Sequence, residues 1–424
     1  MKICVIGTGY VGLISACGFA KLGHDVSCVD LDESKVEMIN NARPPIFEEG
    51  LEALLKEVSG RSLHATANLD AAISGSQLIF ITVGTPSRED GSIDLSYIHS
   101  AFLGALNSPS FSESRKTIVV KSTVVPGTCD SLAKMGEEKT GKAAGVDYGL
   151  CMNPEFLREG KAVYDFFNPD RIVLGATGEE SASAIRALYS SFSCPKLETS
   201  LKAAEMIKYA SNSLLAAKIS FSNEIGNLCK KLGIDVYEVM DGVGLDKRIE
   251  RSFLNAGIGF GGSCFPKDVK ALASISKEHG IDPALLDSVI KVNEAQPAKI
   301  VELATARLGS LSGKKATILG IAFKPDSDDI REAPSIKVIN SLLKEGAEVC
   351  AYDPQALPNL RKLFGERISY ADSLGEALGF SDTIFALTDW AEFKDEKLYK
   401  GKFLLDGRKV LNKKSGVDYE GVCW

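Results

Sequence analysis

The chain has 424 residues, of which 45% are hydrophobic and 25% charged, and it carries a formal net charge of −7 at pH 7. This length exceeds what one hydrophobic core usually serves, so we expect a soluble globular protein of two or three domains. The acidic balance argues against a nucleic-acid binder, which would normally present a basic face, and no run of roughly 18 uncharged apolar residues suggests a membrane span.

The cysteines and the N-terminal segment favour a reducing compartment. The chain enters a strand-like segment at once, so no signal peptide is expected. A disulfide framework or a zinc site would require close cysteine pairs or nearby histidines. The ten cysteines form no C-x-x-C pair, and the four histidines lie far apart. We therefore expect a cytoplasmic protein without a bound metal, in which every cysteine except Cys264 is a reduced core or surface residue.

The first 190 residues or so alternate between strand-like and helix-like segments. Strands are predicted at residues 2–6, 25–30, 77–83, 117–121, 148–152 and 171–175. Amphipathic helical segments lie between them, which is typical of a mostly parallel sheet with right-handed crossovers. The pattern predicts a doubly wound α/β domain over residues 1–198.

A glycine-rich turn follows the first predicted strand. Gly7, Gly9 and Gly12 precede a helix predicted at 13–22. The first glycine permits a tight turn, the second lets the backbone approach a diphosphate, and the third lets the helix pack closely on the strand. Asp30 ends the second strand, where a carboxylate accepts the ribose 2′-hydroxyl of NAD and repels the 2′-phosphate of NADP. The sequence therefore predicts an NAD site, with a helix N-cap as the alternative role of Asp30.

From residue 200 the pattern becomes helical. Residues 200–232 contain one glycine, Gly226, and no proline, which predicts one long helix of roughly 45–50 Å. A long helix between two α/β units typically provides a dimer surface. We therefore expect a central helical dimerisation domain over residues 199–308, with further helices at 236–241, 267–279 and 283–308.

A second alternating unit is predicted over residues 309–424. Its strands are expected at 315–320, 348–352, 383–387 and 403–406, with a helix at 334–345, and residues from Lys413 onward stay unassigned. The turn after its first strand lacks the glycine fingerprint but carries Lys324 and Arg331. Open sheets bind ligands at the carboxyl ends of their strands, so these cations favour a phosphorylated ligand over a second dinucleotide. Solvated loop charges are the alternative.

The segment G-F-G-G-S-C-F-P-K-D, residues 259–268, places Cys264 between a glycine-rich turn and the start of a helix. Pro266 suits the first helical position, because its missing N–H would have no intrahelical partner there. A thiol at a helix N-terminus meets unpaired N–H groups and the positive end of the helix dipole, which favour the thiolate. The segment predicts a cysteine nucleophile.

Three more side chains are candidates for chemistry with this thiol. Asp268 lies four residues after Cys264 and on the same side of the first helical turn, so it could orient a water or accept a proton. A favourable charge at a helix N-terminus is its alternative role. Lys208 and Asn212 share one face of the long helix, as a buried functional pair or as an exposed one.

A thiolate with NAD permits a two-step oxidation. Oxidation of an alcohol to an aldehyde removes one hydride and needs no cysteine. Addition of the thiolate to the aldehyde gives a thiohemiacetal, which loses a second hydride to become a thioester that water cleaves. From the residues alone we predict a four-electron NAD dehydrogenase with a phosphorylated substrate.

The motifs together resemble those of the UDP-glucose/GDP-mannose dehydrogenase family, over essentially the whole chain and in the same order. They are G-T-G-Y-V-G at 7–12, K-S-T-V-V-P-G-T at 121–128, N-P-E-F-L-R-E-G at 153–160, Lys208 with Asn212, the Cys264 loop and A-F-K-P at 322–325. The resemblance implies two Rossmann-like α/β domains joined by a long central helix. It also implies oxidation of UDP-glucose to UDP-glucuronate with two NAD.

The residues around Cys264 bear on the substrate that the resemblance implies. Relatives of the UDP-N-acetylmannosamine type tend to carry a histidine before Ile/Val-Pro in place of Ser263–Pro266. GDP-mannose dehydrogenases typically have leucine where Phe265 stands. UDP-glucose is therefore favoured, and GDP-mannose or another nucleotide sugar is the alternative.

The resemblance also implies roles for individual residues. Cys264 would be the nucleophile, and Lys208 with Asn212 would stabilise the oxyanion. Asp268 with Thr123 would position the water, and Glu155 would be the acid–base candidate. The cofactor would meet Gly7, Gly9, Tyr10, Val11, Gly12, Asp30, Lys35, Thr85, Thr123, Glu159 and Arg331. The nucleotide sugar would meet Glu155, Phe156, Leu157, Lys208, Asn212, Arg248, Phe260, Gly261, Lys324 and Arg408. Arg248 matches an arginine that the family lends to a neighbouring subunit, which implies a homodimer or a larger homo-oligomer.

Two other classes of function stay open at this point. A β-hydroxyacid dehydrogenase also pairs a Rossmann domain with a helical domain and a helix lysine, but it removes one hydride and would not need Cys264 or the second α/β unit. A non-catalytic NAD-sensing protein with a regulatory sugar-nucleotide site would leave Cys264, Lys208 and Asp268 without a purpose.

Overall fold

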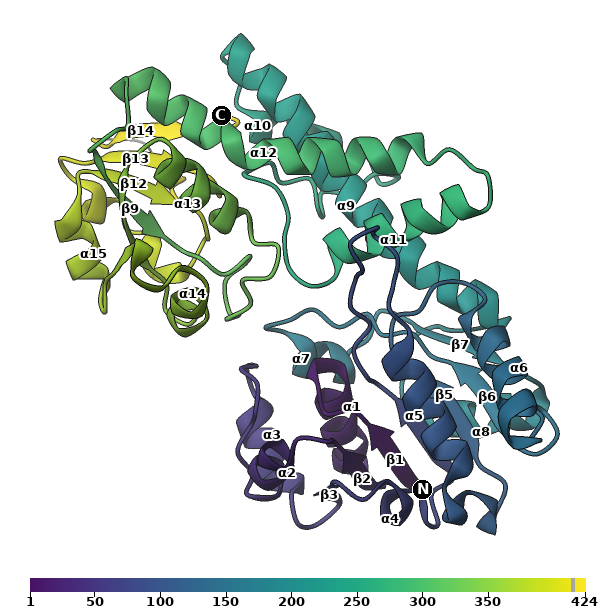
Figure 1. Ribbon diagram of the computed structural model, residues 1–424. Coiled ribbons are helices and arrows are strands. Elements are labelled where there is room, and N and C mark those ends of the chain that lie inside the picture. Colours follow the sequence, from purple (N-terminus) through teal and green to yellow (C-terminus); the bar gives the residue numbers. More distant parts are fainter. Residues whose placement is uncertain (413–415) are drawn as a thin grey trace. The chain divides into compact units, whose positions relative to one another are not determined.

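The structure is a computed structural model that describes residues 1–412 and 416–424. It divides into two compact units, Met1–Ser211 and Asn212–Trp424, which are described separately (Figure 1). Each unit contains a Rossmann-like sheet that is mostly or entirely parallel, and the boundary between the units falls within a long helix, so the predicted fold class is confirmed. The division into domains 1–198, 199–308 and 309–424 stays a prediction.

The first unit, all of whose residues are described, contains a sheet of order β3-β2-β1-β4-β5-β6-β7-β8. The strands are β1 (Lys2–Ile6), β2 (Asp25–Val29), β3 (Leu63–Thr66), β4 (Leu78–Ile81), β5 (Thr117–Val120), β6 (Gly149–Met152), β7 (Ile172–Ala176) and β8 (Lys196–Thr199). β6 and β7 pair antiparallel, and the other neighbours pair in parallel. The sequence does not predict β3 and β8, because both are four-residue edge strands in which polar residues interrupt the apolar run.

Helices cover both faces of this sheet. They are α1 (Tyr10–Lys21), α2 (Glu33–Asn40), α3 (Leu51–Val58), α4 (Leu69–Ile73), α5 (Ser96–Asn107), α6 (Thr128–Thr140), α7 (Ala162–Phe167) and α8 (Glu179–Leu188). α1 packs against α3 and α7, while α5 packs against α6 (Figure 1). Side chains alternate along a strand, so Ile3 and Val5 of β1 join one core cluster and Cys4 and Ile6 join the other. Burial on both faces explains the continuous apolar strands.

The long helix predicted at 200–232 is α9 (Leu201–Leu232), of 32 residues. It is followed by α10 (Val236–Gly244), α11 (Phe265–Glu278) and α12 (Ala284–Leu308). α11 begins two residues earlier than predicted, so Pro266 occupies the second helical position and the prediction of the first is wrong. Proline is tolerated at either position, since first-turn N–H groups have no intrahelical partner.

The described part of the second unit contains a parallel sheet of order β11-β10-β9-β12-β13-β14. The strands are β9 (Lys315–Leu319), β10 (Glu348–Tyr352), β11 (Ser369–Tyr370), β12 (Thr383–Ala386), β13 (Phe403–Asp406) and β14 (Asp418–Gly421), and the helices are α13 (Pro334–Lys344), α14 (Leu357–Phe364) and α15 (Leu374–Phe380). The sequence misses β11, which has two residues, and β14, which lies in the unassigned segment after Lys413. Residues 413–415 themselves lie outside the described residues.

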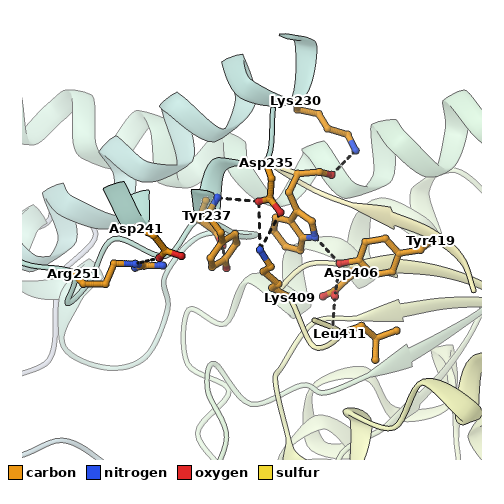
Figure 2. A network of polar contacts seen from close by, with 11 residues as sticks. Lys230, Asp235, Tyr237, Asp241, Arg251, Asp406, Lys409, Leu411 and Tyr419 are labelled. Carbon is orange, nitrogen blue, oxygen red and sulfur yellow. Dashed lines mark hydrogen bonds and ion pairs between the residues drawn. The ribbon is translucent and has the colours of Figure 1, made fainter. Parts of the chain in front are cut away.

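A polar network connects the helices of the second unit to its sheet (Figure 2). Lys409 Nζ lies 3.1 Å from Asp235 Oδ2 at the start of α10, and the Tyr419 hydroxyl donates to Asp406 Oδ2 at 2.9 Å. Burial raises the pKa of Asp406, whose other oxygen accepts the backbone N–H of Arg408 at 3.0 Å. The network therefore fixes the turn that carries Arg408.

Gly226 lies in α9 where the helix packs closely against Cys423 and Ala256, which leaves no room for a larger residue. A Cβ at residue 226 would lie 2.7 Å from Cys423 Cβ and 3.2 Å from Ala256 Cβ. We expect Gly226→Ala to destabilise the protein by about 1–3 kcal/mol through overpacking, seen as a lower Tm in calorimetry.

Gly242→Ala is the matched control, because a Cβ at this position in α10 meets no described atom within 4 Å. That substitution should stabilise the helix by about 0.5–1 kcal/mol. A Tm of Gly226→Ala at or above the wild-type value would contradict the steric explanation.

Candidate functional site

The turn from β1 into α1 has the geometry of a dinucleotide-binding turn. Gly7 has a φ of 99°, which favours glycine. A Cβ at Gly12 would lie 1.9 Å from the carbonyl oxygen of Gly7, so only glycine allows this packing of helix on strand. A Cβ at Gly9 would meet no described atom within 4 Å, which leaves the backbone open to a ligand. α1 begins at Tyr10, three residues before the predicted start, because Gly9 is its N-cap.

The N-terminus of α1 also fits an anion. Among the described residues no side chain caps this helix, and its first turn carries no acidic residue. First-turn N–H groups lack intrahelical partners and lie at the positive end of the helix dipole, so those of Tyr10 and Val11 fit a diphosphate.

Asp30 lies beside this turn at the end of β2. Its carboxylate accepts the Thr8 backbone N–H at 2.9 Å and the Thr8 hydroxyl at 2.5 Å, and Lys35 Nζ lies 4.0 Å away. Partial burial alone would raise the pKa of Asp30, but these hydrogen bonds bring it below its usual value. Asp30 is therefore ionised at neutral pH, as a ribose acceptor requires.

Thr85 and Thr123 come together at the carboxyl edge of the same sheet. They follow the neighbouring parallel strands β4 and β5. The Thr85 hydroxyl donates to the carbonyl oxygen of Thr123 at 3.0 Å, and the Ser122 hydroxyl donates to the carbonyl oxygen of Val83 at 2.7 Å. These bonds fix both loops where open sheets bind ligands.

Glu155 and Lys208 form a buried ion pair. Their Oε1 and Nζ atoms lie 2.7 Å apart, and the side chains are 7% and 4% exposed. The second oxygen of Glu155 accepts the backbone N–H of Leu157 at 2.6 Å. Burial by itself raises the pKa of Glu155, but the charge of Lys208 and its hydrogen bond bring the pKa below its usual value. Glu155 therefore stays ionised beside Lys208.

A second lysine, Lys121, lies near this pair; in the sequence it opens the 121–128 motif but is given no role there. Its Nζ donates to Asn153 Oδ1 at 3.0 Å. Burial lowers the pKa of Lys121 to about 8, with the charge of Glu155 raising it and that of Lys208 lowering it further. The charges of two lysines, Lys208 and Lys121, thus lower the pKa of one carboxylate, Glu155. A lysine directly after the apolar run of residues 118–120 was the signal that could have found it.

The rest of the 153–160 segment is partly buried around the same pair. The guanidinium of Arg171 stacks 3.9 Å from the centre of the Phe156 ring, and Lys208 Nζ lies 5.5 Å from that centre. Leu157 and Glu159 are both partly exposed. Phe156 and Leu157 pack against the core clusters and keep part of their surface exposed.

In the second unit, Cys264 is the N-cap of α11 and is partly buried. The Ser263 hydroxyl lies 3.5 Å from its sulfur. The backbone N–H of Asp268 donates to the carbonyl oxygen of Cys264 at 2.8 Å, which closes the first helical turn. The placement of the thiol at a helix N-terminus is therefore as predicted.

Asp268 is 1% exposed and holds two neighbours. Its Oδ2 accepts from Asn212 Nδ2 at 2.6 Å, and its Oδ1 accepts from Lys267 Nζ at 2.6 Å. The structure thus brings Asn212 and Asp268 together, and it adds Lys267, which the sequence analysis does not single out.

Buried amides hold the glycine-rich segment before Cys264. Asn293 of α12 accepts the N–H of Phe260 at 2.7 Å and donates to its carbonyl oxygen at 3.0 Å. Gln296 donates to the carbonyl oxygen of Gly257 at 2.8 Å, and Asn223 accepts the Gly257 N–H at 2.8 Å. The sequence analysis did not identify these amides. A polar residue on an otherwise apolar helix face is the pattern that could have indicated them.

A cavity of about 360 Å³ lies beside this segment, and it is lined by Ile219, Phe253, Asn255, Gly259, Phe260, Gly261, Phe265, Phe323 and Arg408. Ligand pockets are commonly this large and mostly apolar, with a few polar groups that orient the ligand. Burial lowers the pKa of Arg408, and the charge of Asp389 opposes this. The cavity therefore offers aromatic surface and one cation, a combination that fits a nucleotide with an anionic group.

The other predicted residues of the second unit lie on loops. Lys324 Nζ lies 5.4 Å from the centre of the Phe323 ring, next to the cavity. Arg331 is 66% exposed and pairs with Asp329 at 2.7 Å, while its carbonyl oxygen accepts the N–H of Gly262 at 2.9 Å. Arg248 is 88% exposed and pairs with Asp246 at 2.6 Å. The structure thus links the backbone of Arg331 to the cysteine segment.

Asp353 explains why the second sheet does not offer a second dinucleotide site. It follows β10, in the place that Asp30 has after β2. One oxygen of Asp353 accepts the N–H groups of Ile321 and Ala322 at 2.6 and 3.0 Å, and also that of the Trp390 indole at 3.1 Å. With 2% exposure, this carboxylate is committed to the turn and cannot meet a ribose.

Over the described ranges, 1–412 and 416–424, no helix is long and apolar enough to cross a membrane. Within those ranges no group of three histidine, cysteine, aspartate or glutamate residues could hold a metal ion.

Lys121 gives a pH-dependent prediction. Between pH 8 and the ordinary lysine pKa of 10.5, the unfolded chain keeps this proton while the folded protein loses it, so the stability contribution of Lys121 rises with pH. Lys121→Met removes a buried charge and should therefore raise the Tm relative to wild type more at pH 7 than at pH 9.5. The gain in the free energy of unfolding should differ between the two pH values by an amount on the order of 1–3 kcal/mol. Lys134→Met is the control, since that side chain is 79% exposed. A pH-independent Tm difference between Lys121→Met and wild type would contradict the prediction.

Comparison with known proteins agrees with this geometry. Residues 1–193, 202–295 and 317–413 match the NAD binding, central and UDP binding domains of the UDP-glucose/GDP-mannose dehydrogenase family. The chain is 41% identical to UDP-glucose 6-dehydrogenase AglM of Haloferax volcanii, and the match covers 100% of both chains. It is 44% identical to UDP-glucose 6-dehydrogenase TuaD of Bacillus subtilis, and this match covers 97% of this chain and 90% of the relative. It is similar to a UDP-glucose dehydrogenase structure from Pyrobaculum islandicum, with a TM-score of 0.94, 42% identity and coverage of 100% and 97%. The chain belongs to the UDP-glucose/GDP-mannose dehydrogenase family.

Proposed function

We propose that this chain oxidises UDP-glucose to UDP-glucuronate and reduces two NAD per sugar through a cysteine-linked intermediate. The observation that carries the proposal is Cys264 at the N-terminus of α11, in a chain whose first unit has the NAD-binding geometry. Relatives at 41–44% identity over nearly the whole chain bear the name UDP-glucose 6-dehydrogenase, which supports the choice of substrate.

NAD held at the α1 turn would supply the hydride acceptor for each of two oxidations. In the first, the C6 hydroxyl of glucose loses a hydride and a proton and becomes an aldehyde. The thiolate of Cys264 then forms an S–C bond with the aldehyde carbon, and the oxygen takes up a proton. The thiohemiacetal loses the second hydride and a proton, and water cleaves the resulting thioester to release the carboxylate and the thiolate. The sum is one alcohol, two NAD and one water converted to one carboxylate, two NADH and three protons.

Lys208 and Asn212 are assigned to the oxygen at C6, where negative charge develops. The ammonium of Lys208 and the amide of Asn212 can donate hydrogen bonds to an oxyanion. Glu155 is assigned a proton-transfer role, because it is ionised and its hydrogen bond to Lys208 provides a path for the proton. Asp268 and Thr123 are assigned to the position of the hydrolytic water.

The binding roles follow the predicted residues. We assign the NAD diphosphate to the turn of Gly7, Gly9 and Gly12 with the N–H groups of Tyr10 and Val11, the ribose to Asp30, and further cofactor contacts to Lys35, Thr85, Thr123, Glu159 and Arg331. We assign the nucleotide sugar to Phe156, Leu157, Phe260, Gly261, Lys324 and Arg408. Aromatic lining and the buried cation Arg408 support a nucleotide in the cavity. The ten free cysteines support a reducing, cytoplasmic location.

We further propose that the active form is a homodimer or a larger homo-oligomer. Leu214, Phe221 and Leu228 recur every seven residues on α9 and are 66%, 54% and 55% exposed. This spacing places them on one stripe of the helix, which a second copy could cover. The 88% exposure of Arg248 supports its role in a neighbouring subunit's site.

The stoichiometry of NADH tests the function. With limiting UDP-glucose and excess NAD, we expect two NADH per sugar, measured by absorbance at 340 nm and by chromatography of the product. One NADH per sugar would favour a simple alcohol dehydrogenase, and none would reject UDP-glucose in favour of GDP-mannose or another nucleotide sugar.

Cys264→Ser should lower the rate of UDP-glucuronate release by at least about 10³-fold, because an alkoxide is not available at neutral pH to replace the thiolate. Cys194→Ser is the control, since Cys194 is also partly buried but lies in the first unit. Release of UDP-glucuronate by Cys264→Ser at a near wild-type rate would exclude the covalent route.

Subunit complementation tests the role of Arg248. Arg248→Ala and Cys264→Ser should each be inactive alone. A mixed dimer would contain one intact site, so random exchange of equal amounts should restore roughly a quarter of the wild-type activity. The same mixture without subunit exchange, checked by light scattering and native mass spectrometry, is the control. No recovery in confirmed mixed dimers would place Arg248 in its own subunit's site, and wild-type activity of Arg248→Ala alone would place it in none.

A further inference from the structure

Glu48 is a buried carboxylate that the reaction chemistry does not use. It lies in the segment between α2 and α3 and is 6% exposed. Its Oε2 accepts the backbone N–H of Gly160 at 2.7 Å, and its Oε1 accepts that of Ala162 at 2.6 Å. A carboxylate is buried only where such partners replace water, so these contacts define its orientation.

The hydroxyl of Tyr10 completes this arrangement. It donates to Glu48 Oε2, accepts the N–H of Gly160 at 3.0 Å and lies 3.4 Å from the carbonyl oxygen of Arg158. Burial and the neighbouring Glu48 raise the pKa of Tyr10, so the hydroxyl keeps its proton as a donor. Tyr10 is also the first residue of α1, whose N-terminus forms the dinucleotide turn.

The segment held by these two side chains carries Glu155, the buried carboxylate that pairs with Lys208. Near its beginning, Asn153 accepts from Lys121, and Glu155 pairs with Lys208. Near its end, Arg158 closes on Asp165 at 2.6 Å. Without Glu48, the backbone N–H groups of Gly160 and Ala162 would lose their carboxylate acceptor, and the end of the segment would be held only by Tyr10 and by the Arg158–Asp165 pair.

We propose that Glu48 and Tyr10 are positioning residues that hold the 153–161 segment against the first turn of α1, and thereby keep Glu155 and Glu159 in register with bound NAD. Neither side chain touches a reacting atom. The expected effect on the catalytic rate rests on the proposed function. The expected effect on the mobility of the 153–161 segment depends only on the fold of the NAD-binding domain. A misplacement of about 1 Å costs up to about 10²-fold in rate, so a loosened segment should be visible in kcat.

Hydrogen exchange tests the held segment without substrate. In the full chain, peptides that contain Gly160 and Ala162 should exchange about tenfold faster in Glu48→Gln, because an amide offers one acceptor oxygen where the carboxylate offers two. Glu49→Gln is the matched control, since Glu49 is the exposed neighbour in sequence. Equal exchange in Glu48→Gln and wild type would overturn the proposal, whatever the activity on UDP-glucose.

Tyr10→Phe isolates the link to α1, because it leaves both backbone bonds of Glu48 in place. We expect kcat to fall about tenfold or more while the NAD dissociation constant, measured by titration calorimetry, changes less than about twofold. Tyr97→Phe, at a side chain that is 59% exposed in α5, is the control. An unchanged kcat together with a lower Tm would show a purely structural role and overturn the proposal. If wild type yields no NADH from UDP-glucose, the proposed function fails, and the exchange arm still decides the role of Glu48.

Discussion

Burial of charge is the constraint on which the first unit depends. Lys208 and Glu155 are both almost fully buried, and each is tolerated because the other lies 2.7 Å away. That requirement fixes one turn of α9 to the segment after β6. Lys121 adds a second ammonium, held by Asn153, so the cluster keeps an excess of positive charge in a region from which water is largely excluded. Such a preorganised cluster can stabilise an oxyanion without reorganisation.

A carboxylate follows the second strand of each Rossmann-like sheet, but its surroundings differ between the two sheets. Asp30 and Asp353 occupy equivalent positions after the second strand of each Rossmann-like order, and both accept hydrogen bonds from the turn after the first strand. Asp30 has an oxygen bonded by Thr8 and keeps 15% side-chain exposure, so a ribose can reach it. Asp353 also accepts from Trp390 and is closed to solvent. A fold shared by two domains therefore offers a dinucleotide site in one of them.

The features that the sequence predicts are those encoded locally. The turn of Gly7, Gly9 and Gly12, the N-terminal cysteine of α11 and the long α9 depend on short spacings within one element. Asn212 and Asp268 are 56 residues apart, and Gly257 is held by residues 34 and 39 positions away, so only tertiary structure brings these groups together. Edge strands such as β3, β8 and β11 are short and partly polar, which leaves little periodic signal. The start of α11 is misplaced because proline fits either of the first two helical positions.

The excess positive charge around Glu155 has a consequence for the end of the proposed reaction. The sugar enters as a neutral alcohol and leaves as a carboxylate, so each turnover creates an anion from an uncharged group. In its proposed role, the Lys208 ammonium that favours a transient oxyanion would also favour the permanent charge of the product. The stronger this stabilisation is, the more slowly the carboxylate would depart, because product release can limit turnover in place of the chemical step. In the proposed reaction, Glu155, the carboxylate paired with Lys208, would oppose that retention and so shift the balance between chemistry and release.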